Sequence, residues 1–127
     1  MDTCNTSQAI KKVRERGNKF FAAGELELAI ATYDQAISLH PSPDPKALAA
    51  CFSNRAAAHL KLGSYAFAER DASSALQLVA NDTEASAVVL QLKVLYRRAT
   101  ARKVCVCVYV RYYIQHHQIR CIVGDAE

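Results

Sequence analysis

The chain has 127 residues, of which 51% are hydrophobic and 22% charged, and its formal net charge is +4. This length suits one domain with a core of modest size, and the composition is ordinary for a globular protein. Gly and Pro are few, at four and three residues, which favours an all-helical fold. The sequence shows no apolar signal segment near its start and no run of about 18 apolar residues, so we expect neither secretion nor a membrane span.

The cysteines and the charges point to a reduced, cytoplasmic chain with an acidic partner. There are five cysteines, an odd number, and their positions do not resemble a secreted disulfide framework: Cys4, Cys51, Cys105, Cys107 and Cys121. A run of cations without an acid lies between Lys93 and Lys103. Such a run suits an acidic partner, although a solvated helix face explains it equally well.

Two parts of the chain resemble each other when residues 15–41 are placed against residues 54–80. The comparison aligns small residues at three positions, which are Gly24 with Gly63, Ala29 with Ala68, and Ala36 with Ala75. A third copy begins at residues 92–103, where Tyr-Arg-Arg-Ala echoes Ser-Asn-Arg-Ala of the second copy. Self-similarity at such a period is typical of helical repeat proteins.

Each copy reads as two helices joined by a short turn. In the first copy, apolar residues recur at helical spacing from Ile10 to Phe21 and again from Leu26 to Ile37. The turn at Ala23-Gly24 separates them, because Gly can adopt a left-handed conformation. Asp44 is then suited to cap the N-terminus of the next helix, and Pro45 is suited to its first helical position. We expect the next helices at about 45–62 and 65–79, and a long third one at about 83–103.

This pattern resembles the tetratricopeptide repeat (TPR), a helix–turn–helix unit of about 34 residues. The first copy fills the motif's positions with Gly17, Phe20, Ala29, Tyr33, Ala36 and Pro41. The second copy has Ala56 in place of the Gly and Ala80 in place of the Pro. The resemblance implies an all-α fold of antiparallel helix–turn–helix repeats, a TPR superhelix of about two and a half repeats. It covers residues 8–103, with repeat 1 at about 10–41, repeat 2 at about 49–80, and the first helix of repeat 3 at about 83–103.

Five polar residues are expected to face the concave groove, which the first helix of each pair lines in such a superhelix. The four-residue spacing places Arg14 with Asn18, and Lys93 with Arg97, on common helix faces. Asn54 occupies the corresponding level of the second copy. Amides donate N–H groups without adding charge, and a guanidinium can hold a carboxylate in bidentate fashion. These residues therefore predict an anion site for a peptide with two carboxylates close together.

The segments "VRERGNKF", "FSNRAAAHLKLGSY" and "LKVLYRRATA" resemble the first helices of chaperone-adaptor TPR domains. These domains occur in stress-inducible organising co-chaperones and in UCS-type co-chaperones. The resemblance implies a non-enzymatic, co-chaperone-like module with a two-carboxylate clamp. The implied partners are cytosolic heat-shock chaperones of the seventy- and ninety-kilodalton classes, bound by their acidic C-terminus. Four clamp positions match, at Asn18, Asn54, Lys93 and Arg97, while Arg14 stands where the family usually has Lys, and the two cations are not interchangeable at a fitted site.

Other functions have weaker support in the sequence. A general TPR scaffold that binds an internal segment of another protein would need no free carboxylate. Nucleic-acid binding would rest on the basic run alone, and we expect no nucleic-acid or membrane partner. A metal site has candidate ligands at poorly matching spacings, which are Cys105, Cys107, His116, His117 and Cys121, so we expect no metal and no cofactor. No catalytic arrangement or phosphate-binding Gly loop is present, which argues against an enzyme.

Residues 104–127 do not continue the repeat. A turn Gly is expected near Val106 and is absent, and the Ala and aromatic stripe stops after Lys103. In "VCVCVYV" the stretch Val-Cys-Val-Cys is what a repeating GT dinucleotide encodes, Tyr and Val follow from TAT GTA, and introns begin with GT. Our hypothesis is that residues 104–127 are a non-repeat tail of translated intron, with an edge strand or a continued helix as the alternative. The third-repeat helix would then lack its covering helix at Val94 and Leu95, and the chain would be marginally stable and prone to aggregation.

Overall fold

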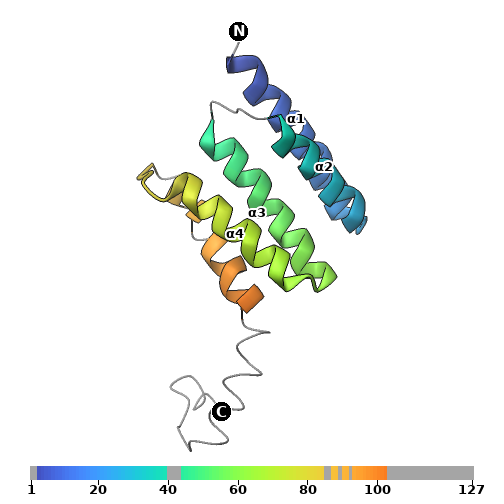
Figure 1. Cartoon of the computed structure of the whole chain (residues 1–127). Helices are drawn as coiled ribbons and strands as arrows, with labels where there is room; N and C mark the ends of the chain where they lie inside the picture. The colour runs from blue at the N-terminus through green and yellow to red at the C-terminus, as the bar shows by residue number, and fades with distance from the viewer. Residues whose placement is uncertain (1–2, 40–43, 85–86, 89, 92, 103–127) are drawn as a thin grey trace, which may run out of the picture.

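The computed structural model describes residues 3–39, 44–84, 87–88, 90–91 and 93–102, which are helical apart from short turns (Figure 1). The helices run α1 (Thr3–Ala22), α2 (Leu26–Ser38), α3 (Pro45–Leu62) and α4 (Tyr65–Val79). The described residues between 87 and 102 are also helical, and we call this segment the third-repeat helix. No strand occurs in these described ranges. The predicted all-α architecture of antiparallel helix pairs is therefore confirmed.

Two glycines at matching repeat positions make the turns within the helix pairs. Gly24 and Gly63 have φ angles of 82° and 78°, a left-handed conformation in which a Cβ atom would be strained. Gly63 caps the end of α3, where its N–H bonds back to the carbonyls of His59 and Leu60. These turns fold α2 back on α1 and α4 back on α3.

The starts of the helices agree only in part with the sequence pattern. At α3 the Asp44 carboxylate accepts hydrogen bonds from the backbone N–H groups of Lys46, at 3.0 Å, and Ala47, at 3.3 Å, as predicted for an N-cap. The third-repeat helix was expected from about residue 83, but Thr83 and Glu84 are not helical. The Asp82 carboxylate accepts a hydrogen bond from the Glu84 N–H at 2.9 Å, and the Glu84 carbonyl accepts one from the Val88 N–H at 2.9 Å, so the helical hydrogen bonds begin at Glu84.

The α1–α2 pair packs closely because small residues face large ones. Ala29 and Ala36 are fully buried, and the Tyr33 side chain lies against Gly17. A Cβ atom added at Gly17 would lie 2.6 Å from Cε1 of Tyr33, which is shorter than any normal contact. The Gly of the motif is therefore needed so that the Tyr33 ring can cross α1.

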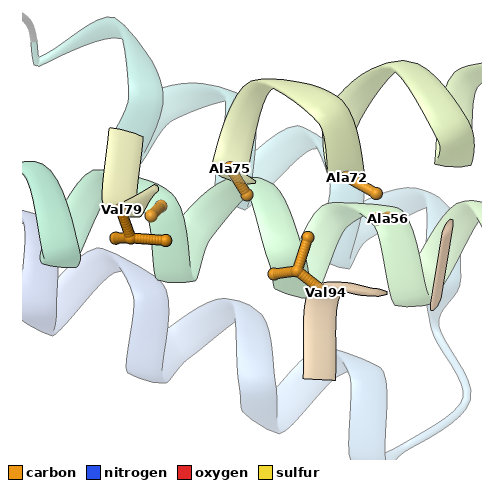
Figure 2. Close-up of a cluster of buried hydrophobic side chains, with 6 residues drawn as sticks. Ala56, Ala72, Ala75, Val79 and Val94 are labelled. Atoms are coloured by element: carbon orange, nitrogen blue, oxygen red, sulfur yellow. The ribbon is translucent and has the colours of Figure 1, made fainter. Parts of the chain in front are cut away.

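The second core is built mainly from Ala and joins α3, α4 and the third-repeat helix. Figure 2 shows its labelled members, and the buried set is Ala49, Ala56, Ala72, Ala75, Val79 and Val94. Val94 was predicted to be uncovered, and this is wrong, because its side chain is fully buried against α3 and α4. The exposed residues are its neighbours, Leu95 at 49% and Tyr96 at 73%, since each step along a helix rotates the side chain by about 100°.

A partly buried ion-pair network joins α3 to the two second helices. The Arg55 guanidinium bonds both oxygens of Asp71, at 2.8 and 2.6 Å, and one oxygen of Asp34 at 2.6 Å. The Asp71 side chain is only 7% exposed. Hydrogen bonding to Asp71 raises the pKa of Arg55. Arg55 is therefore a structural residue.

The hypotheses about residues 104–127, including the metal ligands proposed there, lie outside the described residues. Where the structure describes the chain, no helix is long and apolar enough to cross a membrane.

Candidate functional site

Two amides from consecutive repeats meet where α1 passes α3. Asn54 Nδ2 donates a hydrogen bond to Asn18 Oδ1 at 2.9 Å. Both residues come from the first helix of their pair, as the repeat pattern requires. The structure therefore brings these two predicted site residues into direct contact, although they are 36 positions apart in the chain.

A tyrosine from a second helix completes this contact. The Tyr33 hydroxyl donates to Asn18 Oδ1 at 2.7 Å, and the Tyr33 residue is only 1% exposed. Burial raises the pKa of Tyr33 to about 12, the nearby Cys51 thiol adds to this, and the charges of Arg97 and Arg14 oppose it. Both guanidiniums are therefore close enough to act on the hydroxyl electrostatically.

Arg97 is held in place by a neutral partner. One of its terminal nitrogens donates to the Ser53 carbonyl oxygen at 2.8 Å and also to the Ser53 hydroxyl. Burial lowers the pKa of Arg97, and only Tyr33 acts in the opposite direction. Within the described ranges no carboxylate pairs with it, whereas Arg55 and Arg102 both have acidic partners. Arg97 is a partly desolvated cation without a counter-ion there.

The other two predicted cations lie further apart. Arg14 is half-buried and lines an open pocket of about 450 Å³ together with Lys11, Ala47 and Leu90. Lys93 is exposed, one turn before Arg97 on the third-repeat helix. Among the residues that the structure describes, neither makes an ion pair or a side-chain hydrogen bond. Arg14 and Lys93 therefore have no hydrogen bond to the other predicted site residues, and Lys93 is the more exposed of the two.

We call Arg14, Asn18, Asn54 and Arg97 the groove cluster. The amides offer neutral N–H donors, both guanidiniums act electrostatically on the adjoining Tyr33 hydroxyl, and no carboxylate of the described chain pairs with either of them. Such a set can hold an anion by charge-assisted hydrogen bonds. Cys51 lies nearby but is fully buried, and burial raises the pKa of its thiol to about 11, so it is not a nucleophile at neutral pH.

Sequence reasoning missed Tyr33 and Ser53 as members of this site. Tyr33 was interpreted as part of the apolar stripe of α2, where the repeat motif has an aromatic residue. One signal was available, because a buried tyrosine hydroxyl normally needs a hydrogen-bond partner. Ser53 carried no such signal, since its bond to Arg97 joins residues 44 positions apart.

Fold and site together define a helical-repeat domain of TPR-like type with a basic, amide-lined groove cluster. No family model matches the chain. The chain is 40% identical over 90 residues to "Protein unc-45 homolog B" of Danio rerio, which covers 71% of this chain and 9% of that protein. It is 34% identical over 103 residues to the mitochondrial import receptor subunit TOM70 of Homo sapiens, and the aligned region covers 81% of this chain and 15% of that protein.

A third relative is the mitochondrial import receptor subunit TOM34 of Rattus norvegicus, 35% identical over 98 residues, covering 75% of this chain and 29% of that protein. The chain therefore spans less than a third of each of these relatives. These similarities agree with the TPR-like helical domain that the fold indicates.

Proposed function

We propose that this chain is a non-enzymatic, co-chaperone-like interaction module. In this proposal it binds the acidic C-terminus of cytosolic heat-shock chaperones of the seventy- and ninety-kilodalton classes. The ligand is held in a carboxylate clamp made by Arg14, Asn18, Asn54, Lys93 and Arg97. The similarity to protein unc-45 homolog B and to two import receptor subunits supports a protein-interaction role of this kind.

The unpaired charge of Arg97 is the observation that carries the proposal. Burying part of a guanidinium without a carboxylate partner costs stability. A bound carboxylate would remove that cost, and Arg97 keeps N–H groups free for it, because only one terminal nitrogen is used on Ser53. An acidic ligand therefore has a ready partner in this groove.

The rest of the groove cluster suits a ligand with two carboxylates. A C-terminal Asp residue carries two such groups on one residue, its side chain and its chain terminus. Asn18 and Asn54 can donate N–H groups to one of them, with Arg14 beside it. Lys93 and Arg97 are one turn apart on the third-repeat helix and can serve the other.

Titration calorimetry with an acidic peptide ending in Asp tests this function. We expect the free-acid peptide to bind in the micromolar range, or at about −8 kcal/mol. The same peptide with an amidated C-terminus should bind about tenfold more weakly, because one charge-assisted contact is lost. Equal affinities for the two peptides would refute the clamp.

The alternative is a TPR scaffold that binds an internal segment of another protein. The open pocket beside Arg14 favours this alternative, since Ala47, Ala50 and Leu90 contribute apolar surface to its lining. Such a scaffold would bind the amidated and the free peptide equally well.

A cytoplasmic location belongs to the proposal as well, and fluorescence microscopy of the tagged full chain tests it.

A further inference from the structure

We infer that Tyr33 is a positioning residue that sets the direction of the Asn18 amide, because its hydroxyl donates to Asn18 Oδ1 at 2.7 Å from a fully packed ring. This inference rests on the proposed clamp function. Tyr33 lies on α2, a second helix, whereas the proposed clamp residues come from first helices. It acts on a ligand only through Asn18.

The hydroxyl has little freedom to move. The Tyr33 ring packs directly on Gly17, the residue before Asn18, with so little space that a Cβ atom there would be 2.6 Å away. The residue is 1% exposed. The position of the hydroxyl relative to Asn18 is therefore determined by the packing of α1 on α2.

The hydrogen-bond directions follow from this arrangement. Asn18 Oδ1 accepts from both the Tyr33 hydroxyl and Asn54 Nδ2. If both amides reversed, Asn18 could still bond Asn54, but the buried Tyr33 proton would lose its acceptor. Burying an unpaired donor is costly. Tyr33 thus holds the oxygen of Asn18 inward and leaves both N–H groups of Asn18 for a ligand.

Removing the hydroxyl should therefore weaken carboxylate binding without a direct ligand contact being lost. In Tyr33→Phe, the two amides can adopt either direction, and only one direction offers the Asn18 donors. We expect a loss of about threefold to tenfold in affinity for the free-acid peptide, the scale of a preorganised hydrogen bond. The amidated peptide should lose less.

The experiment is a double-mutant cycle measured by calorimetry with the acidic peptide ending in Asp. The variants are Tyr33→Phe, Asn18→Ala and the pair, and Tyr96→Phe is the matched control, because Tyr96 is exposed and its hydroxyl bonds no described residue. Tyr33→Phe should reduce affinity in the wild-type background and have no further effect in Asn18→Ala. An equal loss in both backgrounds would mean that Tyr33 acts through the fold, and it would overturn the inference.

A readout without ligand separates this inference from the proposed function. In NMR spectra of the free protein, the signals of the Asn18 side-chain amide protons should change position in Tyr33→Phe and keep their position in Tyr96→Phe. An unchanged Asn18 signal would overturn the positioning role, whatever the peptide does. If the wild type does not discriminate the peptides while the Asn18 signal moves, the clamp fails and the positioning role stands.

Asn18→Asp gives a second test that keeps the fold intact. It retains an acceptor for Tyr33 and Asn54 but offers no N–H group, so it should bind the free-acid peptide at least as weakly as Asn18→Ala. Wild-type affinity in Asn18→Asp would show that the Asn18 donors are not used, and the inference would fall.

Discussion

Arg97 places a positive charge where neighbouring helices exclude much of the water, and the described residues provide no acid beside it. Its only described hydrogen bonds go to Ser53, a neutral residue. A charge in such surroundings reduces the stability of the folded chain. The charge of Arg97 thus lowers the stability of the free chain, whereas in the proposed clamp it strengthens ligand binding.

Replacing Arg97 with Met should separate these two demands. We expect the melting temperature of Arg97→Met to stay equal or to rise, because the desolvated charge is gone and an apolar chain of similar length remains. Binding of the free-acid peptide should fall at least tenfold. Differential scanning calorimetry and peptide titration on the same samples measure both. A large drop in melting temperature would show that Arg97 serves mainly to hold the fold.

Lys93 gives a cleaner test of affinity, because its side chain is exposed and makes no ion pair with the described residues. Lys93→Ala should weaken peptide binding by about 1–3 kcal/mol, the scale of a lost charge-assisted hydrogen bond. Lys12→Ala is the control, since Lys12 is equally exposed and lies two positions from Arg14, on a different face of α1. If both variants lose the same affinity, only net charge matters and the clamp has no specific Lys93 contact.

At the scale of the helices, Arg55 is the main polar connection among α2, α3 and α4. Its variant Arg55→Ala should lower the free energy of unfolding by about 3–5 kcal/mol, because the buried Asp71 would lose both guanidinium hydrogen bonds and, among the described residues, keep only His59 nearby, at 3.8 Å. Arg102→Ala is the matched control, since the Arg102 side chain is 50% exposed and its partner Glu69 is 35% exposed, and a pair open to solvent is worth about 0–1 kcal/mol. Urea unfolding followed by circular dichroism measures both. Similar losses for the two variants would contradict this ranking.

The helix pairs could be predicted where local chemistry decides the structure. Gly24, Gly63 and Asp44 each favour a turn or a cap through their own backbone or side chain. The start of the third-repeat helix differs slightly from the prediction of about residue 83, because its helical hydrogen bonds begin at the Glu84 carbonyl, after Asp82 has bonded the Glu84 N–H. Val94 was misplaced because a single helix sequence shows an apolar stripe but not which neighbour covers it.

The candidate site, too, was predictable only where the repeat pattern alone determines the position of a residue. Spacing and repeat register were enough to predict that Asn18 and Asn54 share one groove, which their hydrogen bond agrees with. The partners of these residues were not predictable in this way. Tyr33 and Ser53 reach the site through packing between helices, and their own sequence neighbourhoods look like ordinary core positions.

For the molecule as a whole, the outer side of the third-repeat helix is one of the places where large apolar side chains are exposed. Leu95 and Tyr96 are largely exposed there, while Val94 on the other side is buried. An uncovered apolar face at the end of a repeat array lowers solubility, and natural arrays cover it with a capping helix.

Replacing residues 104–127 with a regular amphipathic helix that covers Leu95 should raise the melting temperature and reduce aggregation. A Gly/Ser segment of equal length is the control, and it should behave like the original chain. Thermal melting with light scattering measures both properties. If the added helix gives no gain over the Gly/Ser segment, the exposed face does not limit stability.

The translated-intron hypothesis stays a separate prediction, and genomic sequence at the Lys103 codon tests it.

The contacts that join one repeat to the next across the groove also have a mechanical meaning. Asn54 to Asn18 and Arg97 to Ser53 are polar links between first helices. Apolar cores cross the same boundaries, because Cys51 packs with Ile10 and Ala36 of the first pair, and Val94 packs on α3 and α4. A pulling force along the array would therefore load the polar links and the apolar cores together. The groove would open only when the packing between repeats also yields, so a stretched chain would keep its ligand until neighbouring repeats separate.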